Sequence, residues 1–320
     1  MCADDFHPDY SDVLRALPSG LAEHVVHVFG ERGRAWLDGL PAVVAGLAGR
    51  WGLRLGSRRY PGGTHSLVLA ATRADRSPAL LKVPVQDEEN RHEAAALRCY
   101  AGDGSALLYA ADPETGALLM ERMEPGAPLL EHPDRELAID IACALLRRLR
   151  RPVPAGHPFA SVPALVERWS AGFPVRQARH GMPVPVGLMR EVMATVESLR
   201  APDGPERLVN RDAHLGNVLA AEREPWLLID PKPLAGEAAF DGGWLLIDVL
   251  SRAPSTGNAR WLAARVADGL GVAPERVRAW ALARVAENVF WDLDCGDDPD
   301  ENLALLAVLS GAAGGRGGRG

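Results

Sequence analysis

Asp212, Asn217 and Asp230 are the residues of this sequence whose types and spacing are best suited to chemistry. Asn217 follows Asp212 by five positions, and Asp230 ends the apolar run WLLID. Carboxylate and amide oxygens are ligands for Mg²⁺, and a carboxylate can also accept the proton of a hydroxyl group. Phosphoryl transfer needs such a set, because it depends mainly on positioning and on neutralising phosphate charge. We predict that Asp212 orients a substrate hydroxyl and accepts its proton, while Asn217 and Asp230 hold the Mg²⁺ that bridges the phosphates of ATP.

Two short strands are expected to bring these residues together. Residues 217–221 (NVLAA) and 226–230 (WLLID) are apolar runs separated by the polar turn EREP, which predicts an antiparallel hairpin. Neighbouring strands lie about 5 Å apart, so Asn217 and Asp230 would be adjacent. Each residue alone could simply start a turn, cap a strand or end one. The spacing of Asp212 and Asn217, which is that of protein-kinase catalytic loops, favours a function for the group.

A second group of residues could hold the nucleotide. Lys82 lies inside the apolar run LLKVPV, where a lysine normally needs a partner. Glu93, in the helix-forming segment that follows, is the expected partner, as in the lysine–glutamate ion pair of kinase-like folds. Glu88 and Glu89 are alternative partners, and a solvent-facing lysine on an edge strand is the structural alternative. We therefore predict Lys82 and Glu93 as nucleotide-binding residues.

Two further segments could contact the nucleotide. The backbone amides of the loop at residues 60–66 (YPGGTHS) and the Ser66 hydroxyl could cover its phosphates. Two glycines and a proline are equally typical of an ordinary loop. Glu121 and Met123 end a predicted hairpin at the junction of two lobes, where backbone groups could bind adenine. Ser66, Glu121 and Met123 complete the predicted nucleotide-binding set.

The periodicity of the apolar residues predicts the elements that position these groups. A helical appendage over residues 21–51 precedes a β-rich region, and the pattern beyond Pro125 is mainly helical. Strands are expected over residues 66–71, 79–85, 106–110 and 117–123, and helices over residues 88–100, 135–149, 162–171, 188–199, 244–252, 259–270, 274–293 and 302–309.

These elements predict an α+β, protein-kinase-like arrangement of two lobes around a cleft. The N-terminal lobe is small and β-rich, with one key helix, and the C-terminal lobe is larger and mainly helical. The expected domains are residues 1–123 and 124–310. The tail at residues 311–320 is rich in glycine and too poor in apolar residues to pack, so we expect it to be disordered.

Composition and charge exclude several classes of protein. The 320 residues are 47% hydrophobic, with a formal net charge of -7 and a pI of about 5.7, whereas nucleic-acid binders usually present a concentrated basic face. No apolar run is long enough to span a membrane, and the polar, acidic N-terminus is unlike a signal peptide. The four cysteines form no CxxC pair, which favours reduced, buried thiols. We expect a cytoplasmic monomer that binds neither nucleic acid nor membranes.

The same motifs resemble the aminoglycoside phosphotransferase family, a branch of the protein-kinase-like fold, and especially its streptomycin 6-phosphotransferase members. The family pattern H-G-D-x-H-x-x-N reads NRDAHLGN at residues 210–217, and its metal-binding I-D-P is found at residues 229–231. The likeness covers nearly all of the chain and continues through residues 236–241 and 287–292.

One position departs from the family pattern: Asn210 stands where the family has its first histidine. That histidine usually supports the loop rather than reacting, so the resemblance still implies activity. It also implies that His214, which matches the second histidine, is structural. Asp241 is expected to brace the loop or to cap the helix that follows it.

The resemblance implies a cationic antibiotic as the substrate, and the composition near the C-terminus agrees. The acidic segment consists of Glu287, Asp292, Asp294, Asp297, Asp298, Asp300 and Glu301. A carboxylate at about 4 Å from a cation gains about 1 kcal/mol in water and about 4 kcal/mol near a protein surface. We predict that Glu287, Trp291 and Asp292 contact the substrate, while residues 297–301 form a solvated helix end and turn.

The sequence thus predicts an ATP-dependent O-phosphotransferase that modifies a streptomycin-type aminoglycoside and confers resistance to it. One alternative is a kinase for another small molecule, such as hydroxyurea, choline or a sugar. A second is a catalytically silent nucleotide-binding module. The silent module is disfavoured because the sequence has all four key residues, Asp212, Asn217, Asp230 and Lys82. Asn210 is the feature that favours it.

Overall fold

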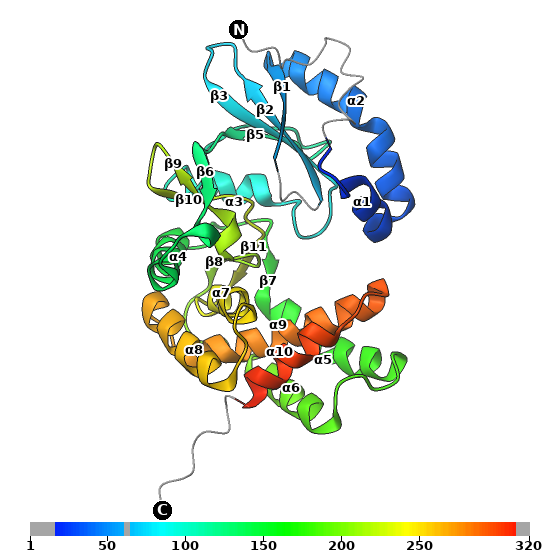
Figure 1. Ribbon diagram of the computed structural model, residues 1–320, viewed down its shortest axis with the longest axis vertical. Coiled ribbons are helices and arrows are strands. Elements are labelled where there is room, and N and C mark those ends of the chain that lie inside the picture. The colour runs from blue at the N-terminus through cyan, green and yellow to red at the C-terminus, as the bar shows by residue number, and fades with distance from the viewer. Residues whose placement is uncertain (1–16, 61–64, 312–320) are drawn as a thin grey trace, which may run out of the picture. The chain divides into compact units, whose positions relative to one another are not determined.

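An antiparallel five-stranded sheet forms the frame of the N-terminal unit (Figure 1). The computed structural model describes residues 17–60 and 65–311, and the chain divides into two units between Gly126 and Ala127. The strand order is β1-β2-β3-β5-β4. The strands are β1 (Arg54–Arg59), β2 (Ser66–Thr72), β3 (Pro78–Pro84), β4 (Leu108–Ala111) and β5 (Leu118–Glu121). Both predicted hairpins are confirmed, whereas β1, whose run RLGSRR has little apolar periodicity, was not expected.

The two faces of this sheet pack against different helices. Leu67, Leu69 and Leu81 lie in one core cluster with residues of α2 (Glu31–Trp51). Leu80, Leu118 and Met120 cluster instead with residues of α3 (Glu93–Tyr100). Because successive side chains of a strand point to opposite faces, Lys82 shares the α3 face with Leu80.

Two of the predicted helices have different boundaries in the structure. The expected appendage is two helices, α1 (Leu21–Phe29) and α2, separated by Gly30 at φ +59°. The helix expected from residue 88 begins at Glu93 instead. The Asp87 carboxylate accepts hydrogen bonds from the backbone N–H groups of Glu89 and Asn90, so these residues form a turn.

A long central helix organises the C-terminal unit. This helix, α9 (Pro274–Cys295), contacts α5, α6, α7, α8 and α10 (Figure 1). The helices of this unit are α4 (Arg135–Leu149), α5 (Val162–Arg179), α6 (Val186–Ser198), α7 (Phe240–Ser251), α8 (Thr256–Leu270), α9 and α10 (Asp300–Gly311). All seven were predicted, but α5 continues past Gly172 and Pro174 because Phe173 and Gln177 are buried. The predicted tail beyond Gly311 lies outside the described residues.

Short strands carry the loops of the C-terminal unit. The predicted hairpin is confirmed as β9 (Val218–Ala221) and β10 (Trp226–Leu228), which pair antiparallel. A small sheet that was not expected has the order β7-β11-β8. Its strands are β7 (Ala160–Ser161), β8 (Arg207–Asn210) and β11 (Pro233–Gly236). The remaining short elements are β6 (Pro125–Pro128), η2 (Leu129–Glu131) and η3 (Leu215–Asn217).

Three of the four cysteines lie in the described ranges. No helix in these ranges is both long and apolar enough to cross a bilayer. Cys99, Cys143 and Cys295 are free thiols, and Cys2 lies outside the described residues. Only Cys143 is buried, so the prediction of buried thiols is wrong for Cys99 and Cys295, which are half-buried. Burial, assisted by the charge of Asp140, raises the pKa of the Cys143 thiol to about 12. Cys143 therefore behaves as a small buried hydrophobe, as predicted.

Helices α7 and α9 cross closely at Gly243. A Cβ atom added there would lie 2.6 Å from the Trp280 Cβ and 2.9 Å from the Ala281 nitrogen. We predict that Gly243→Ala lowers the free energy of unfolding by about 1–3 kcal/mol, because the crossing has no room for a methyl group. Urea denaturation measures this change.

Gly172 provides the matched control, because it lies in the interior of α5 and no neighbouring group is within 4 Å of an added Cβ. Gly172→Ala should raise the free energy of unfolding by about 0.5–1 kcal/mol. Equal effects of the two substitutions would contradict the close crossing.

Candidate active site

The Lys82 ammonium and the Glu93 carboxylate form a buried ion pair in the N-terminal unit. Lys82 Nζ lies 2.7 Å from Glu93 Oε2, and the two residues are 5% and 1% exposed. Strand alternation turns Lys82 toward α3, and Glu93 occupies the first position of that helix. The pairing with Glu93, rather than with Glu88 or Glu89, is thus confirmed, and the solvent-facing alternative is wrong. Removing either partner would leave an uncompensated buried charge.

Ser66 lies on the same face of the sheet as Lys82. It is the first residue of β2 and is buried, and the register pairs Val68 with Lys82 and Ser66 with Pro84. Residues 61–64 of the predicted phosphate loop lie outside the described residues.

The predicted adenine-binding segment is partly engaged inside its own hairpin. The Glu121 carboxylate accepts a hydrogen bond from the Leu107 N–H at 3.0 Å, and the Glu121 N–H donates to the Leu107 carbonyl at 2.8 Å. Glu121 therefore closes the β4–β5 hairpin. The Met123 side chain, two positions further along the chain, is buried. Only the backbone of this segment could therefore contact adenine.

The hairpin of the C-terminal unit places the other predicted residues together. Asn217 Nδ2 donates to both the backbone carbonyl and the Oδ2 atom of Asp212, each at 3.2 Å. The Ile229 N–H donates to the Asn217 carbonyl at 2.9 Å. This bond holds the backbone of Asp230, the next residue, near Asn217. Asp230 has φ +50°, an unusual value for a residue other than glycine. Such strained positions are enriched at functional sites.

The donors of this site fit Mg²⁺. With Asn217 Nδ2 turned to Asp212, Oδ1 is the hard oxygen that this side chain could offer a cation, and Asp230 directly follows Ile229, the residue bonded to the Asn217 carbonyl. Mg²⁺ is usually held by one or two such protein groups, and its other ligands are water and phosphate oxygens. In the described part of the chain, no three or more His, Cys, Asp or Glu residues group as a metal site. The pair therefore suits a cation shared with a nucleotide better than a structural metal.

Asn210, the departure from the family pattern, braces the loop. Its side-chain Oδ1 accepts hydrogen bonds from the backbone N–H groups of Asp212 at 3.0 Å and Lys232 at 2.9 Å. Its own N–H donates to Asp241 Oδ1 at 2.6 Å. An asparagine carbonyl thus ties the loop that carries Asp212 to the segment that follows Asp230.

Asp241 holds this brace from α7, as predicted. It is 2% exposed, and its Oδ2 atom lies 3.3 Å from Arg150 Nε. Burial raises the pKa of Asp241 to about 6, although the Arg150 charge and the Asn210 N–H oppose that shift. A carboxylate so enclosed supports the loop and has no access to substrate.

His214 has structural contacts, in line with the expectation. Its Nδ1 atom accepts a hydrogen bond from the Gly216 N–H at 3.1 Å, and its Nε2 atom lies 3.7 Å from Asp212 Oδ1. The residue after His214 is also held: the Leu215 N–H donates a hydrogen bond to the Asp248 carboxylate of α7 at 2.9 Å. Sequence reasoning missed Asp248. The loop is therefore hydrogen-bonded on both sides of Asp212.

Lys232 is a second residue of the site that sequence reasoning missed. Its Nζ atom lies 3.0 Å from Asp212 Oδ2, and the two side chains are 23% and 17% exposed. The signal that could have revealed it is its place in the run IDPKP, two positions after Asp230.

The three predicted substrate residues of α9 have different surroundings. Glu287 Oε1 lies 3.4 Å from Arg211 Nη2, and its other oxygen is bound by Arg284. Burial favours a higher pKa for Glu287, but the charges of Arg284 and Arg211 outweigh it and hold the pKa below its usual value. A substrate cation would have to compete with both guanidinium groups for this carboxylate.

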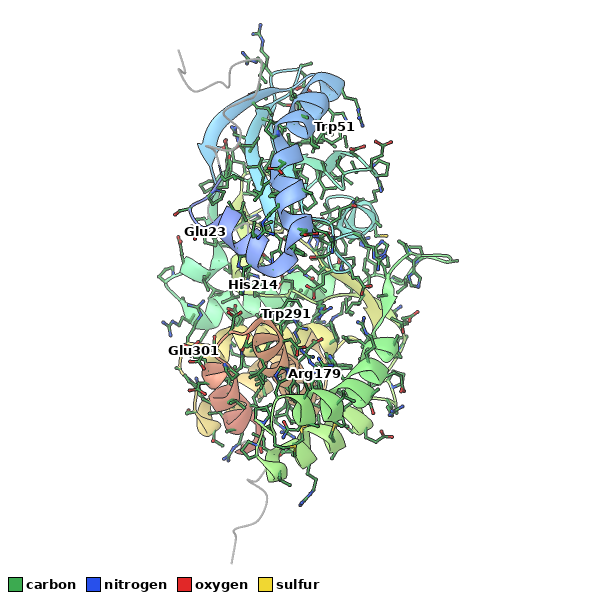
Figure 2. The ribbon with its side chains drawn as sticks, turned by 90° about the vertical axis from the view of Figure 1, so that its right-hand side faces the viewer. Glu23, Trp51, Arg179, His214, Trp291 and Glu301 are labelled. Carbon is green, nitrogen blue, oxygen red and sulfur yellow. The ribbon has the colours of Figure 1, made fainter. Side chains whose placement is uncertain are left out.

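Trp291 and Asp292 lie further along α9. Trp291 is 52% exposed, and Figure 2 shows it in the same unit as His214. Asp292 accepts a hydrogen bond from Asn302 Nδ2 at 2.7 Å. Burial, together with the negative charges of Asp297 and Asp298, raises the pKa of Asp292. Asp292 therefore lies close to other acidic side chains, whereas Asp294, two positions further, is paired with Arg176 and His180.

Comparison with known proteins agrees with this geometry. The chain is 37% identical over 299 residues to a hydroxyurea phosphotransferase of Kitasatospora aureofaciens, covering 92% of this chain and 86% of that protein. It is 37% identical over 296 residues to a streptomycin 6-kinase of Streptomyces griseus, covering 88% of this chain and 92% of that protein.

A solved structure shares the fold, which confirms the predicted α+β, kinase-like class. It is a thermostable variant of an aminoglycoside phosphotransferase in a ternary complex with ADP and hygromycin B. The TM-score is 0.58 at 15% identity, covering 84% of this chain and 98% of that one. The profile of the aminoglycoside/hydroxyurea antibiotic resistance kinases matches residues 50–296, and the chain belongs to that family.

Proposed function

We propose that this kinase transfers the γ-phosphoryl group of ATP to a hydroxyl of a streptomycin-type aminoglycoside and so confers resistance to that antibiotic. The observation that carries the proposal is the arrangement of Asp212, Asn217 and Asp230 on one hydrogen-bonded loop and hairpin. It supplies a base and two magnesium ligands in a chain of a kinase family.

Each residue has a role in the proposed reaction. Asp212 accepts a hydrogen bond from the substrate hydroxyl and takes its proton as the oxygen attacks phosphorus. Asn217 and Asp230 hold Mg²⁺, which when bound would neutralise phosphate charge. Lys82, oriented by Glu93, binds the nucleotide phosphates. These roles combine positioning with charge neutralisation, as phosphoryl transfer requires.

The remaining nucleotide contacts are assigned by position. Ser66 is proposed to bind phosphate from the face of the sheet that it shares with Lys82. The backbone at Met123 is proposed to bind adenine. Glu121 supports that segment through its bonds to Leu107.

The end of α9 supports a cationic acceptor. Asp292 lies in the field of Asp297 and Asp298, and Trp291 offers an exposed aromatic face to a guanidinium group. We propose that Trp291 and Asp292 contact the substrate directly. Glu287 adds negative charge but acts chiefly through Arg211, which it binds.

Hydroxyurea is the second candidate acceptor, because a hydroxyurea phosphotransferase is one of the relatives at 37% identity. The acidic side chains around Asp292 give no advantage to a neutral acceptor, so they favour the aminoglycoside. A silent nucleotide-binding module is disfavoured, because the four residues proposed for catalysis and phosphate binding are all present. Asp212 is hydrogen-bonded to Asn217, and Lys82 is ion-paired with Glu93.

The proposal predicts one phosphorylated product from a panel of acceptors. Purified protein incubated with ATP and Mg²⁺ should add one phosphoryl group to streptomycin, as detected by mass spectrometry. Hydroxyurea, choline and a neutral sugar serve as the comparison acceptors. Phosphorylation of hydroxyurea alone would replace the proposed substrate, and no product from any acceptor would refute the proposed activity.

Asp212→Ala should lower kcat by about 10²–10⁴-fold, because the hydroxyl loses the group that orients it and accepts its proton. Nucleotide affinity, measured by calorimetry with ADP and Mg²⁺, should stay close to that of the wild-type protein. Asp268→Ala, at an exposed position of α8, is the matched control and should leave both quantities unchanged. Full turnover by the Asp212 variant would rule out its assignment as the base.

Trp291→Ala should raise KM for the cationic acceptor by about 5–30-fold at little cost in kcat, since a partly desolvated cation–π contact contributes about 1–2 kcal/mol. Trp261 on α8, 46% exposed, is the matched control. If both tryptophan variants had the same KM as the wild-type protein, the acceptor would bind elsewhere.

A further inference from the structure

Lysine is almost absent from this chain. Of its 35 lysine and arginine residues, only Lys82 and Lys232 are lysines, so the other 33 (35 minus 2) are arginines. Each lysine is paired with a carboxylate of the candidate site: Lys82 with Glu93 at 2.7 Å and Lys232 with Asp212 at 3.0 Å. A chain that uses arginine for every other cation has kept the ammonium group at these two positions.

The two cations differ in a way that matters for phosphate chemistry. A guanidinium is a planar fork suited to bidentate pairing, whereas an ammonium is a compact charge with three rotatable donors. An ion pair with a carboxylate alone would be served by arginine, and this chain uses arginine for most of its ion pairs. A position that must also contact a small, moving group favours lysine.

The backbone of Lys232 is fixed on both sides. Its N–H donates to Asn210 Oδ1 at 2.9 Å, and its carbonyl accepts from the Arg211 N–H at 2.8 Å. Pro231 and Pro233 flank it, and each has a restricted φ. The base of the side chain is therefore positioned by the same brace that holds Asp212.

We propose that Lys232 is a catalytic residue whose ammonium group contacts the transferred phosphoryl group; this inference rests on the proposed phosphotransfer. A hydroxyl held by Asp212 lies about 2.6–3.2 Å from its carboxylate. For a hydroxyl bound to Asp212 Oδ2, the oxygen that Lys232 contacts, the attacking oxygen is about 6 Å or less from Lys232 Nζ, and the phosphoryl oxygens beside it are within direct reach.

The step balances without any further reactant. The acceptor oxygen forms a bond to the γ-phosphorus while the bond to the β–γ bridging oxygen breaks, and ADP leaves with that electron pair. The hydroxyl proton passes to Asp212. As Asp212 loses its negative charge, its attraction for Lys232 weakens, and the ammonium is then available to donate hydrogen bonds to the phosphoryl oxygens. Lys232 itself neither gains nor loses a proton.

The test compares Lys232→Met and Lys232→Arg in the full-length protein. Lys232→Met should lower kcat about 100-fold or more, the scale expected when a transition-state donor is lost, while KM and the affinity for ADP stay within about threefold. Lys232→Arg keeps the charge and the partner of Asp212, so a residue that only forms an ion pair would be rescued by it. We expect Lys232→Arg to recover only a small part of kcat.

A binding measurement provides a readout independent of turnover. ADP, Mg²⁺ and fluoroaluminate together mimic the planar phosphoryl group, and thermal unfolding reports the stabilisation beyond that given by ADP and Mg²⁺ alone. The wild-type protein should gain this extra stabilisation, and both Lys232 variants should lose most of it. Arg148→Met, which removes the partner of Glu224 at the β9–β10 hairpin, is the matched control and should keep it.

The outcomes separate the inference from the proposed function. If Lys232→Arg had the kcat and the fluoroaluminate binding of the wild-type protein, the inference would be overturned. Lys232 would then serve only as the ion-pair partner of Asp212. If Lys232→Met fails to fold, Lys232→Arg decides the question. If the wild-type protein phosphorylates no acceptor, the proposed function fails, and the fluoroaluminate measurement still supports or refutes the contact of Lys232 with phosphate.

Discussion

The side-chain carbonyl of Asn210 holds together the two backbone segments on which the catalytic geometry of the C-terminal unit depends. It accepts from the N–H of Asp212 and from the N–H of Lys232, at 3.0 Å and 2.9 Å. These bonds set the direction in which the loop leaves β8 and in which the chain continues from Asp230 toward β11. A buried amide acceptor with two donors is worth more than two isolated bonds, because neither donor has water as an alternative. The placement of the proposed base, Asp212, beside the proposed magnesium ligands follows from this clamp.

Around the clamp, buried charge is neutralised in pairs that come from different elements. Arg150 at the end of α4 meets Asp241 of α7, and Glu287 of α9 meets Arg211 of the loop. Each pair is costly to break, because the remaining charge would be stranded away from water. Helices distant in sequence are thereby tied to one short loop. The N-terminal unit uses the same device in the Lys82–Glu93 pair between β3 and α3.

The sequence was sufficient to predict a contact of the site wherever a local pattern of residues determined that contact. The position of Lys82 inside an apolar run predicted its buried pair with Glu93, and the two apolar runs around the turn EREP predicted the hairpin that brings Asn217 near Asp230. The position of Lys232 against Asp212 depends instead on the pairing of β8 with β11, two four-residue strands too short to have a readable period. The start of α3 was missed for another reason, because the Asp87 side chain competes with the helix for two backbone donors. No pattern along the chain reports such long-range or competing bonds.

The different surroundings of Glu287 and Asp292 show why an acidic run cannot be interpreted from composition alone. Both carboxylates belong to α9, and they are five positions apart, so they point in different directions around the helix. Glu287 meets two guanidinium groups, and its pKa is lowered, whereas the pKa of Asp292 is raised by burial and by neighbouring acids. The first carboxylate is therefore compensated by the protein itself. The second lies close to Asp297 and Asp298 and accepts a hydrogen bond from Asn302. One helix thus supports the loop of Asp212 through Glu287 and, five positions further along, carries a carboxylate close to other acids, and only the contacts of each side chain distinguish the two.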